Sequence, residues 1–179
     1  MESIKVGVIG YGYWGPNLVR NFAEVPQSQL VAVADLCEDR LTHVRSRYPA
    51  IQTTQDYQDL FTMGLDAAVV ATPPATHFQV ARDCLAHGLH KMIKKPLTLS
   101  SDDAQGLVDL AQAQDLRLMV GHTFEYNPAV RALKRIIESG DLGQVYYVDS
   151  VRASLGLFQA DLNVVWDLAP HDLSILRYI

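Results

Sequence analysis

The chain has 179 residues, of which 49% are hydrophobic and 20% are charged, a composition typical of a soluble globular protein with a buried core. Its formal net charge of -5 gives no general electrostatic reason to bind nucleic acid or an anionic membrane. No apolar run reaches the length of a membrane span, and the first predicted strand begins too early to follow a signal peptide, so we expect a cytoplasmic protein. The two cysteines, Cys37 and Cys84, have no metal-binding or redox spacing, so we expect them to be reduced core residues and we expect no metal site.

Short apolar runs and helical patterns alternate along the chain up to Val120. The apolar runs predict strands at residues 4–9, 30–34, 51–53, 67–71, 90–93 and 116–120. The helical patterns predict helices at residues 16–24, 38–48, 57–63, 75–87 and 100–114. This alternation is typical of βαβ units, whose right-handed crossovers place helices on both faces of a parallel sheet. The sequence therefore predicts an α/β fold with a Rossmann-type, doubly wound parallel sheet.

The pattern changes around Gly121. A helix is predicted from Pro128 to Ser139, followed by a turn and then by an alternating strand at residues 144–153. Residues 154–166 are typical of an irregular connection, and residues 166–179 predict another helix. We interpret residues 1–121 as one domain and residues 122–179 as the start of a second, incomplete α+β domain.

A glycine-rich sequence, GYGYWG, lies between the first predicted strand and the first predicted helix, at residues 10–15. Gly10 permits a tight turn, Gly12 lets the backbone approach a pyrophosphate, and Gly15 allows close contact between helix and strand. The helix N-terminus that follows offers unpaired N–H groups to phosphates. We therefore expect a dinucleotide to bind at Gly10, Gly12, Tyr13, Trp14 and Gly15. Alone, the pattern also fits three glycines in an ordinary turn.

Asp35 ends the second predicted strand, where a carboxylate can accept hydrogen bonds from the hydroxyl groups of the adenosine ribose. The same carboxylate repels a 2′-phosphate, and no arginine or lysine follows it before Arg40, so the sequence favours NAD over NADP. Taken alone, Asp35 also fits a solvated carboxylate at a strand end. Methyltransferases place a glycine loop and an acidic residue on a similar sheet, and they are the competing cofactor class.

Further polar residues follow the fourth and fifth predicted strands, at the edge of the sheet where ligands bind in such folds. Thr72 and Pro73 are expected to line the nicotinamide ribose. His77 fits the start of the next helix better than a catalytic role, and we assign it to the cofactor site with them. Lys95 lies at the same edge and is assigned to the cofactor site as well, with a solvated lysine as the alternative interpretation.

Asp167 and His171 lie four residues apart near the start of the last predicted helix. Side chains with this spacing share one helix face and can act on the same substrate hydroxyl group. The pair also fits a capping acid followed by a surface histidine.

The chain resembles the Gfo/Idh/MocA oxidoreductases, which include inositol and sugar dehydrogenases. The resemblance lies in the order of five motifs, GxGxxG, Asp, ATPP-x-x-H, Lys-Pro-Leu and Asp-x-x-x-His. The resemblance covers the whole chain, including residues 121–129, and favours nicotinamide chemistry over a methyltransferase. It implies hydride transfer between NAD and a secondary hydroxyl of a sugar, cyclitol or nucleotide sugar. It also implies that Lys95 hydrogen-bonds the reacting hydroxyl, that His171 removes its proton, and that Asp167 orients and polarises this pair.

Two departures from the family pattern affect these expectations. Lys94 stands where the family usually has a glutamate, and its charge would tend to lower the pKa of Lys95. Family members are also considerably longer, so residues 122–179 hold only the start of their substrate and oligomerisation domain. The strand at residues 144–153 would then have an unpaired edge, which predicts a homo-oligomer formed through it, or disorder beyond this point. A non-catalytic dinucleotide-binding fragment and an interaction module remain the alternatives.

Overall fold

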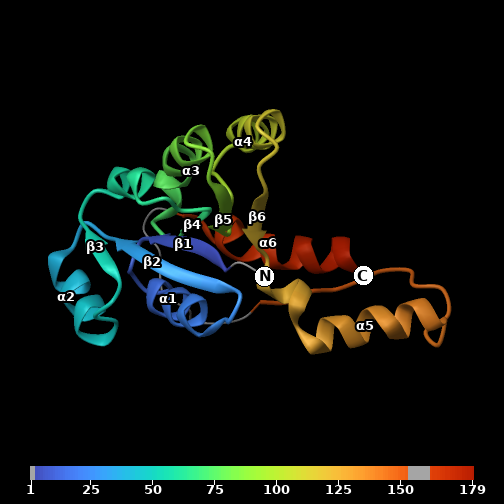
Figure 1. Cartoon of the computed structure of the whole chain (residues 1–179). Coiled ribbons are helices and arrows are strands. Elements are labelled where there is room, and N and C mark those ends of the chain that lie inside the picture. The colour runs from blue at the N-terminus through green and yellow to red at the C-terminus, as the bar shows by residue number, and fades with distance from the viewer. Residues whose placement is uncertain (1–2, 153–161) are drawn as a thin grey trace. The chain divides into compact units, whose positions relative to one another are not determined.

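The computed structural model describes residues 3–152 and 162–179 (Figure 1). The chain divides into two compact units, Met1–Val120 and Gly121–Ile179. The first unit contains the sheet and helices α1 to α4, and the second contains helices α5 and α6.

The six-stranded sheet has the order β3-β2-β1-β4-β5-β6. The strands are β1 (Ile4–Ile9), β2 (Ser28–Ala34), β3 (Gln52–Thr54), β4 (Ala67–Val70), β5 (His90–Lys94) and β6 (Leu118–Gly121). Ile9, the last residue of β1, lies opposite both Ala34 of β2 and Val70 of β4 in parallel register. Because these three strands end level, the loops that follow them meet at one edge of the sheet, where the strand order reverses and where such folds bind ligands. The predicted doubly wound parallel sheet is confirmed.

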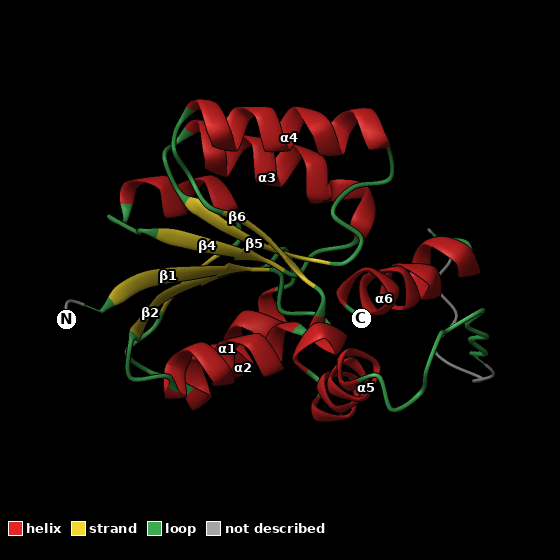
Figure 2. Cartoon of the chain, turned by 90° about the vertical axis from the view of Figure 1, so that its right-hand side faces the viewer, coloured by secondary structure: helices red, strands yellow, loops and turns green. Residues whose placement is uncertain are grey.

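The helices of the first unit cover both faces of the sheet. Figure 2 shows α1 (Gly15–Glu24) and α2 (Glu38–Arg47) on one face, and α3 (His77–Ala86) and α4 (Ser101–Ala113) on the other. Their bounds lie within two residues of the predicted ones, and α3 begins two residues later than predicted. A separate 3₁₀ turn, η2 (Pro74–Thr76), precedes α3. The helix predicted at residues 57–63 is a 3₁₀ helix, η1 (Tyr57–Thr62).

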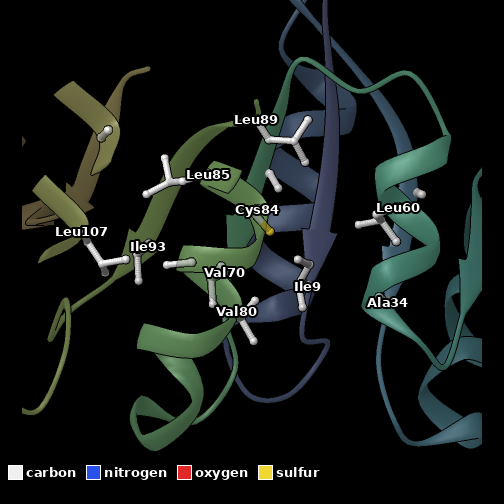
Figure 3. Close-up of a cluster of buried hydrophobic side chains, with 14 residues drawn as sticks. Ile9, Ala34, Leu60, Val70, Val80, Cys84, Leu85, Leu89, Ile93 and Leu107 are labelled. Carbon is white, nitrogen blue, oxygen red and sulfur yellow. The ribbon is translucent and has the colours of Figure 1, made fainter. Parts of the chain in front are cut away.

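Two clusters of buried side chains hold the helices to the sheet. The cluster in Figure 3 lies under α3 and α4, and it includes Ile9, Val70, Leu85, Ile93 and Leu107. The cluster on the other face lies under α1 and α2, and its members include Val8, Val19, Val33, Leu41 and Val69. β4 contributes to both clusters, which explains why its sequence is continuously apolar rather than alternating.

The second unit contains a 3₁₀ turn, η3 (Thr123–Tyr126), and the helices α5 (Pro128–Ser139) and α6 (Val164–Tyr178). The side chain of Asn127 caps α5 by accepting a hydrogen bond from Ala129 N, and Gly140 ends the helix with a φ of 80°. The ammonium group of Lys134 on α5 lies 4.7 Å from the centre of the Tyr178 ring on α6. Both helices were predicted from the sequence, and α6 begins two residues earlier than expected.

The strand predicted at residues 144–153 is wrong for residues 144–152, which form no strand, and Ala153 lies outside the described residues. Val145, Tyr147 and Val151, whose alternation suggested the strand, are 45%, 85% and 78% exposed. A strand needs a neighbour to pair its backbone groups, and the described residues of the second unit include no strand beyond Gly121. Most of the connection predicted at residues 154–166 also lies outside the described residues.

One of the two cysteines is not a core residue. Cys84 is a buried residue of α3, as expected, but Cys37 is exposed. Cys37 immediately precedes α2, in the loop where β2 leaves the core, so its side chain has no apolar layer to enter. Within the described ranges, no helix is long and apolar enough to cross a membrane.

Candidate cofactor site and acid–base residues

The glycine-rich loop after β1 contains two positions at which a side chain would not fit. Gly10 has a φ of 98°, and a Cβ atom there would lie 2.7 Å from the carbonyl carbon of Ala71. A Cβ atom on Gly15 would lie 2.5 Å from the carbonyl oxygen of Gly10. Such contacts are too short for real Cβ atoms, so these two glycines are required by the turn and by the approach of α1 to β1.

Gly12 differs from both, because it is not required by packing. A Cβ atom there would meet only the end of the Arg40 side chain, at 3.8 Å. The backbone at Gly12 is therefore open to a ligand. Beside it, α1 begins without a side-chain cap and without an acidic residue in its first turn. Pro16 has no N–H and the N–H of Asn17 donates to the carbonyl oxygen of Trp14, so the helix start offers an anion mainly the positive end of its dipole. These features fit the pyrophosphate of a dinucleotide.

The two aromatic residues of this loop lie at the surface. Tyr13 is 73% exposed and Trp14 is 47% exposed, and their rings pack edge to face with centroids 5.6 Å apart. Their exposure leaves both side chains accessible to a ligand, as the sequence prediction requires.

Asp35 lies directly after β2 and is nearly buried. Its carboxylate accepts hydrogen bonds from the backbone N–H of Tyr11 at 2.6 Å and from that of Cys37 at 2.9 Å. Arg40 Nη1 lies 3.4 Å from each carboxylate oxygen. The carboxylate is therefore held against the glycine-rich loop.

The ion pair between Arg40 and Asp35 is not predicted by the sequence, in which Arg40 is only the first basic residue after Asp35. Arg40 lies in the first turn of α2, which begins at Glu38 and turns back over the end of β2. The signal for this contact was the predicted start of α2 only a few residues after the end of β2, which brings the side chains of Asp35 and Arg40 together.

His77 begins α3, as expected, and its ring is 1% exposed. Its Nδ1 lies 2.8 Å from the carbonyl oxygen of Pro96, and its Nε2 lies 2.9 Å from the carbonyl oxygen of Thr72. The ring therefore ties the loop after β4 to the loop after β5. Thr72 also accepts a hydrogen bond from the hydroxyl of Thr76, at 2.7 Å. The assignment of His77 to the cofactor site stays a prediction, and the geometry gives it a role in fixing the two loops.

Lys94 is the last residue of β5, and Lys95 follows it at the carboxyl edge of the sheet. Both side chains are partly exposed. Lys94 Nζ lies 4.8 Å from the centre of the Trp14 ring, so its side chain reaches the glycine-rich loop. Successive residues of a strand point to opposite faces, which explains why Lys94 lies beside the α1 face.

Asp167 and His171 lie one turn apart on α6, in the second unit. The ring of His171 packs edge to face on Phe124, with centroids 4.8 Å apart. Arg152 lies over the same phenylalanine ring and donates a hydrogen bond to Asp172 at 2.7 Å. This bond holds the pKa of the Asp172 carboxyl below its usual value. The predicted pair therefore shares a helix, and a neighbouring Phe124–Arg152–Asp172 group was not predicted.

The first unit thus brings the glycine-rich loop, Asp35, Thr72, His77 and Lys94–Lys95 to the edge of one sheet, and α6 carries Asp167 and His171. In the described part of the chain, no three potential ligand side chains are close enough to hold a metal ion.

Residues 4–122 match the family model GFO_IDH_MocA, described as an oxidoreductase family with an NAD-binding Rossmann fold. The chain belongs to this family. Membership removes the methyltransferase alternative, because the family uses a nicotinamide cofactor.

Relatives in the Gfo/Idh/MocA family match almost the whole chain. It is 30% identical to the UDP-N-acetylglucosamine 3-dehydrogenase of Acidithiobacillus ferrooxidans, over 98% of this chain and 54% of that protein. It is 28% identical to the scyllo-inositol 2-dehydrogenase (NAD(+)) of Bacillus subtilis, over 99% of this chain and 54% of that protein. GenD2 from gentamicin A biosynthesis, solved in complex with NAD, has the same fold, with a TM-score of 0.87 and 24% identity over 99% of this chain and 54% of GenD2. The chain spans about half the length of the curated relatives that it matches.

Proposed function

We propose that this chain forms the NAD-binding part, and carries the acid–base residues, of an oxidoreductase acting on a secondary hydroxyl of a sugar, cyclitol or nucleotide sugar. The observation that carries the proposal is the open backbone at Gly12, which lies beside the uncapped start of α1 and near the fixed carboxylate of Asp35. Relatives named as dehydrogenases of UDP-N-acetylglucosamine and of scyllo-inositol support the substrate class.

Each part of the site has a role in holding the dinucleotide. The backbone at Gly12 and the positive end of the α1 dipole bind the pyrophosphate, with Tyr13 and Trp14 beside them. Asp35 accepts hydrogen bonds from the ribose hydroxyls of the adenosine half. Thr72 and Pro73 line the nicotinamide ribose, on a loop that the His77 ring fixes.

The hydroxyl proton and the hydride leave the substrate separately. His171, as a neutral imidazole, takes the hydroxyl proton, and the carbon–oxygen bond becomes a carbonyl. The ammonium of Lys95 donates a hydrogen bond to the same oxygen and stabilises the negative charge that develops on it. Asp167, one helical turn before His171, orients the imidazole and stabilises its protonated form. When bound, NAD accepts the hydride from the carbon.

Titration with NADH tests the cofactor part of the proposal. Energy transfer from Trp14 and Trp166 to the nicotinamide measures the binding. We expect saturable binding of NADH and weaker binding of NADPH. Gly12→Val should abolish binding without unfolding the protein, because its Cβ atom meets only the end of the Arg40 side chain while its branches obstruct the dinucleotide. Asp35→Ala should weaken binding strongly.

Gly106→Val is the matched control, because a Cβ atom at Gly106 on α4 meets nothing within 4 Å and the position is remote from the loop. If the folded wild-type protein does not bind NADH, or if both glycine variants behave alike, the proposed cofactor site is wrong. Reduction of NAD with a panel of sugars and cyclitols, compared in wild type, Lys95→Met and His171→Asn, then tests catalysis. NADH binding without turnover would favour the non-catalytic fragment.

We also propose a cytoplasmic location and a homo-oligomer that forms through residues 144–152. The acidic net charge supports the absence of a nucleic-acid partner. The exposed apolar side chains of Tyr146, Tyr147 and Val151 support self-association, because such patches are rarely left to water. Sedimentation of wild type and of a Tyr146→Ser/Tyr147→Ser variant should show an oligomer only for wild type.

A further inference from the structure

Lys94 lies on the same side of β5 as the glycine-rich loop. Along β5, Ile93 is buried under α3 and α4, while Met92 packs against the cluster under α1 and α2. Because side chains alternate along a strand, Lys94 is on the side of Met92, and its ammonium reaches the Trp14 ring at 4.8 Å. This distance is within the range of a cation–π contact.

Trp14 fixes this ammonium at a particular place. Trp14 immediately precedes the first residue of α1, so its ring belongs to the glycine-rich loop, whose backbone is accessible at Gly12. The first turn of α1 contains no acidic residue. The basic side chain of Lys94 and the positive end of the helix dipole therefore lie at the same loop.

We propose that Lys94 is a cofactor-binding residue, which supplies positive charge to the pyrophosphate of the dinucleotide from its position over the Trp14 ring. The inference rests on the proposed function and goes beyond it by giving this lysine a role that the resemblance does not supply. The aromatic ring holds the long side chain in place, so less conformational freedom is lost when an anion binds.

Calorimetric titration of the full chain with NADH and with ADP-ribose tests this role. ADP-ribose keeps the pyrophosphate and lacks the nicotinamide ring. Lys94→Met should weaken the binding of both molecules roughly tenfold, and Lys94→Arg should restore most of it. Wild type should also show a steeper loss of affinity with added salt than Lys94→Met.

Lys5→Met is the matched control, because it removes the same charge from an exposed residue at the opposite end of β1 and should leave both affinities unchanged. Trp14→Leu provides a second variant in the same contact, and it should weaken ADP-ribose binding while Trp14→Phe keeps most of it.

The outcomes separate the inference from the proposed function. If wild type binds neither molecule, the proposed cofactor site fails. If wild type binds both and Lys94→Met binds them equally well, with the same salt dependence, Lys94 has no role in binding. If only NADH binding changes, Lys94 acts at the nicotinamide end and the pyrophosphate assignment is overturned. If Lys94→Met does not fold, the salt dependence of wild type and the comparison of Trp14→Leu with Trp14→Phe decide whether Lys94 contributes to binding.

Discussion

Replacing Lys91 with methionine is expected to stabilise the first unit by about 1–3 kcal/mol near neutral pH. Lys91 is the second residue of β5 and is only 3% exposed. Among the described residues its side-chain nitrogen makes no hydrogen bond of ordinary geometry, and the thiol of Cys84 offsets the cost of its burial only weakly. Methionine keeps a long unbranched side chain and removes the buried nitrogen.

The effect should depend on pH in a defined direction. Burial lowers the pKa of Lys91 in the folded protein below its ordinary value of 10.5. Between the two pKa values the unfolded chain binds a proton that the folded chain lacks, so the free energy of unfolding of wild type rises with pH, by up to about 1.4 kcal/mol per pH unit. The methionine variant lacks this dependence. Its advantage should therefore be largest at low pH and shrink as the pH approaches 10.5.

Urea denaturation followed by circular dichroism measures both quantities. Burial also raises the pKa of the Cys84 thiol, but Cys84 is present in both proteins, so its contribution largely cancels in the difference. Lys5→Met, at an exposed position, should change stability by less than about 0.5 kcal/mol. The reasoning is refuted if Lys91→Met is less stable than wild type at neutral pH, or if the difference does not change with pH.

Other predictions follow from the loops at the edge of the sheet. Gly15→Ala should lower the free energy of unfolding by about 1–3 kcal/mol, whereas Gly12→Ala should leave it nearly unchanged; equal losses in thermal denaturation would contradict the packing argument. His77→Phe should cost about 1–3 kcal/mol, because the buried ring can no longer donate a hydrogen bond to the Pro96 or the Thr72 carbonyl; His77→Phe as stable as wild type would show that the ring does not hold the loops. Arg40→Leu should weaken NADPH binding more than NADH binding, because Asp35 then repels a 2′-phosphate without a counter-ion. Equal effects on the two cofactors would place Arg40 outside the ribose site.

The alternating elements of the first unit could be predicted because local patterns determine them. Apolar runs such as the one in β4 and breakers such as Gly88 lie within the segment that they specify. The glycine spacing and Asp35 were equally visible, because the chemistry of the site requires fixed residues next to a strand and a helix. The same approach placed Asp167 and His171 on one helix, since their spacing is one turn.

The errors concern features that depend on distant partners. Residues 144–152 alternate as a strand does, but alternation does not supply the neighbour that a strand pairs with. The burial of Lys91 was not expected, because lysine ordinarily reaches solvent and only the packing of α3 on β5 encloses it here. The contact of Lys94 with Trp14 depends on two loops eighty residues apart in the sequence, and only the parallel sheet brings them together.

The hydrogen bonds of Asp35 have a consequence for any attempt to change cofactor preference. This carboxylate would face the ribose, but it also holds the backbone of Tyr11 inside the glycine-rich loop. Exchanging it for a small neutral residue would release the loop, so both cofactors would be lost together and preference would hardly change. Engineering at Arg40, whose guanidinium lies outside that backbone bond, leaves the loop intact. Altering selectivity here means adjusting the counter-ion and keeping the acid.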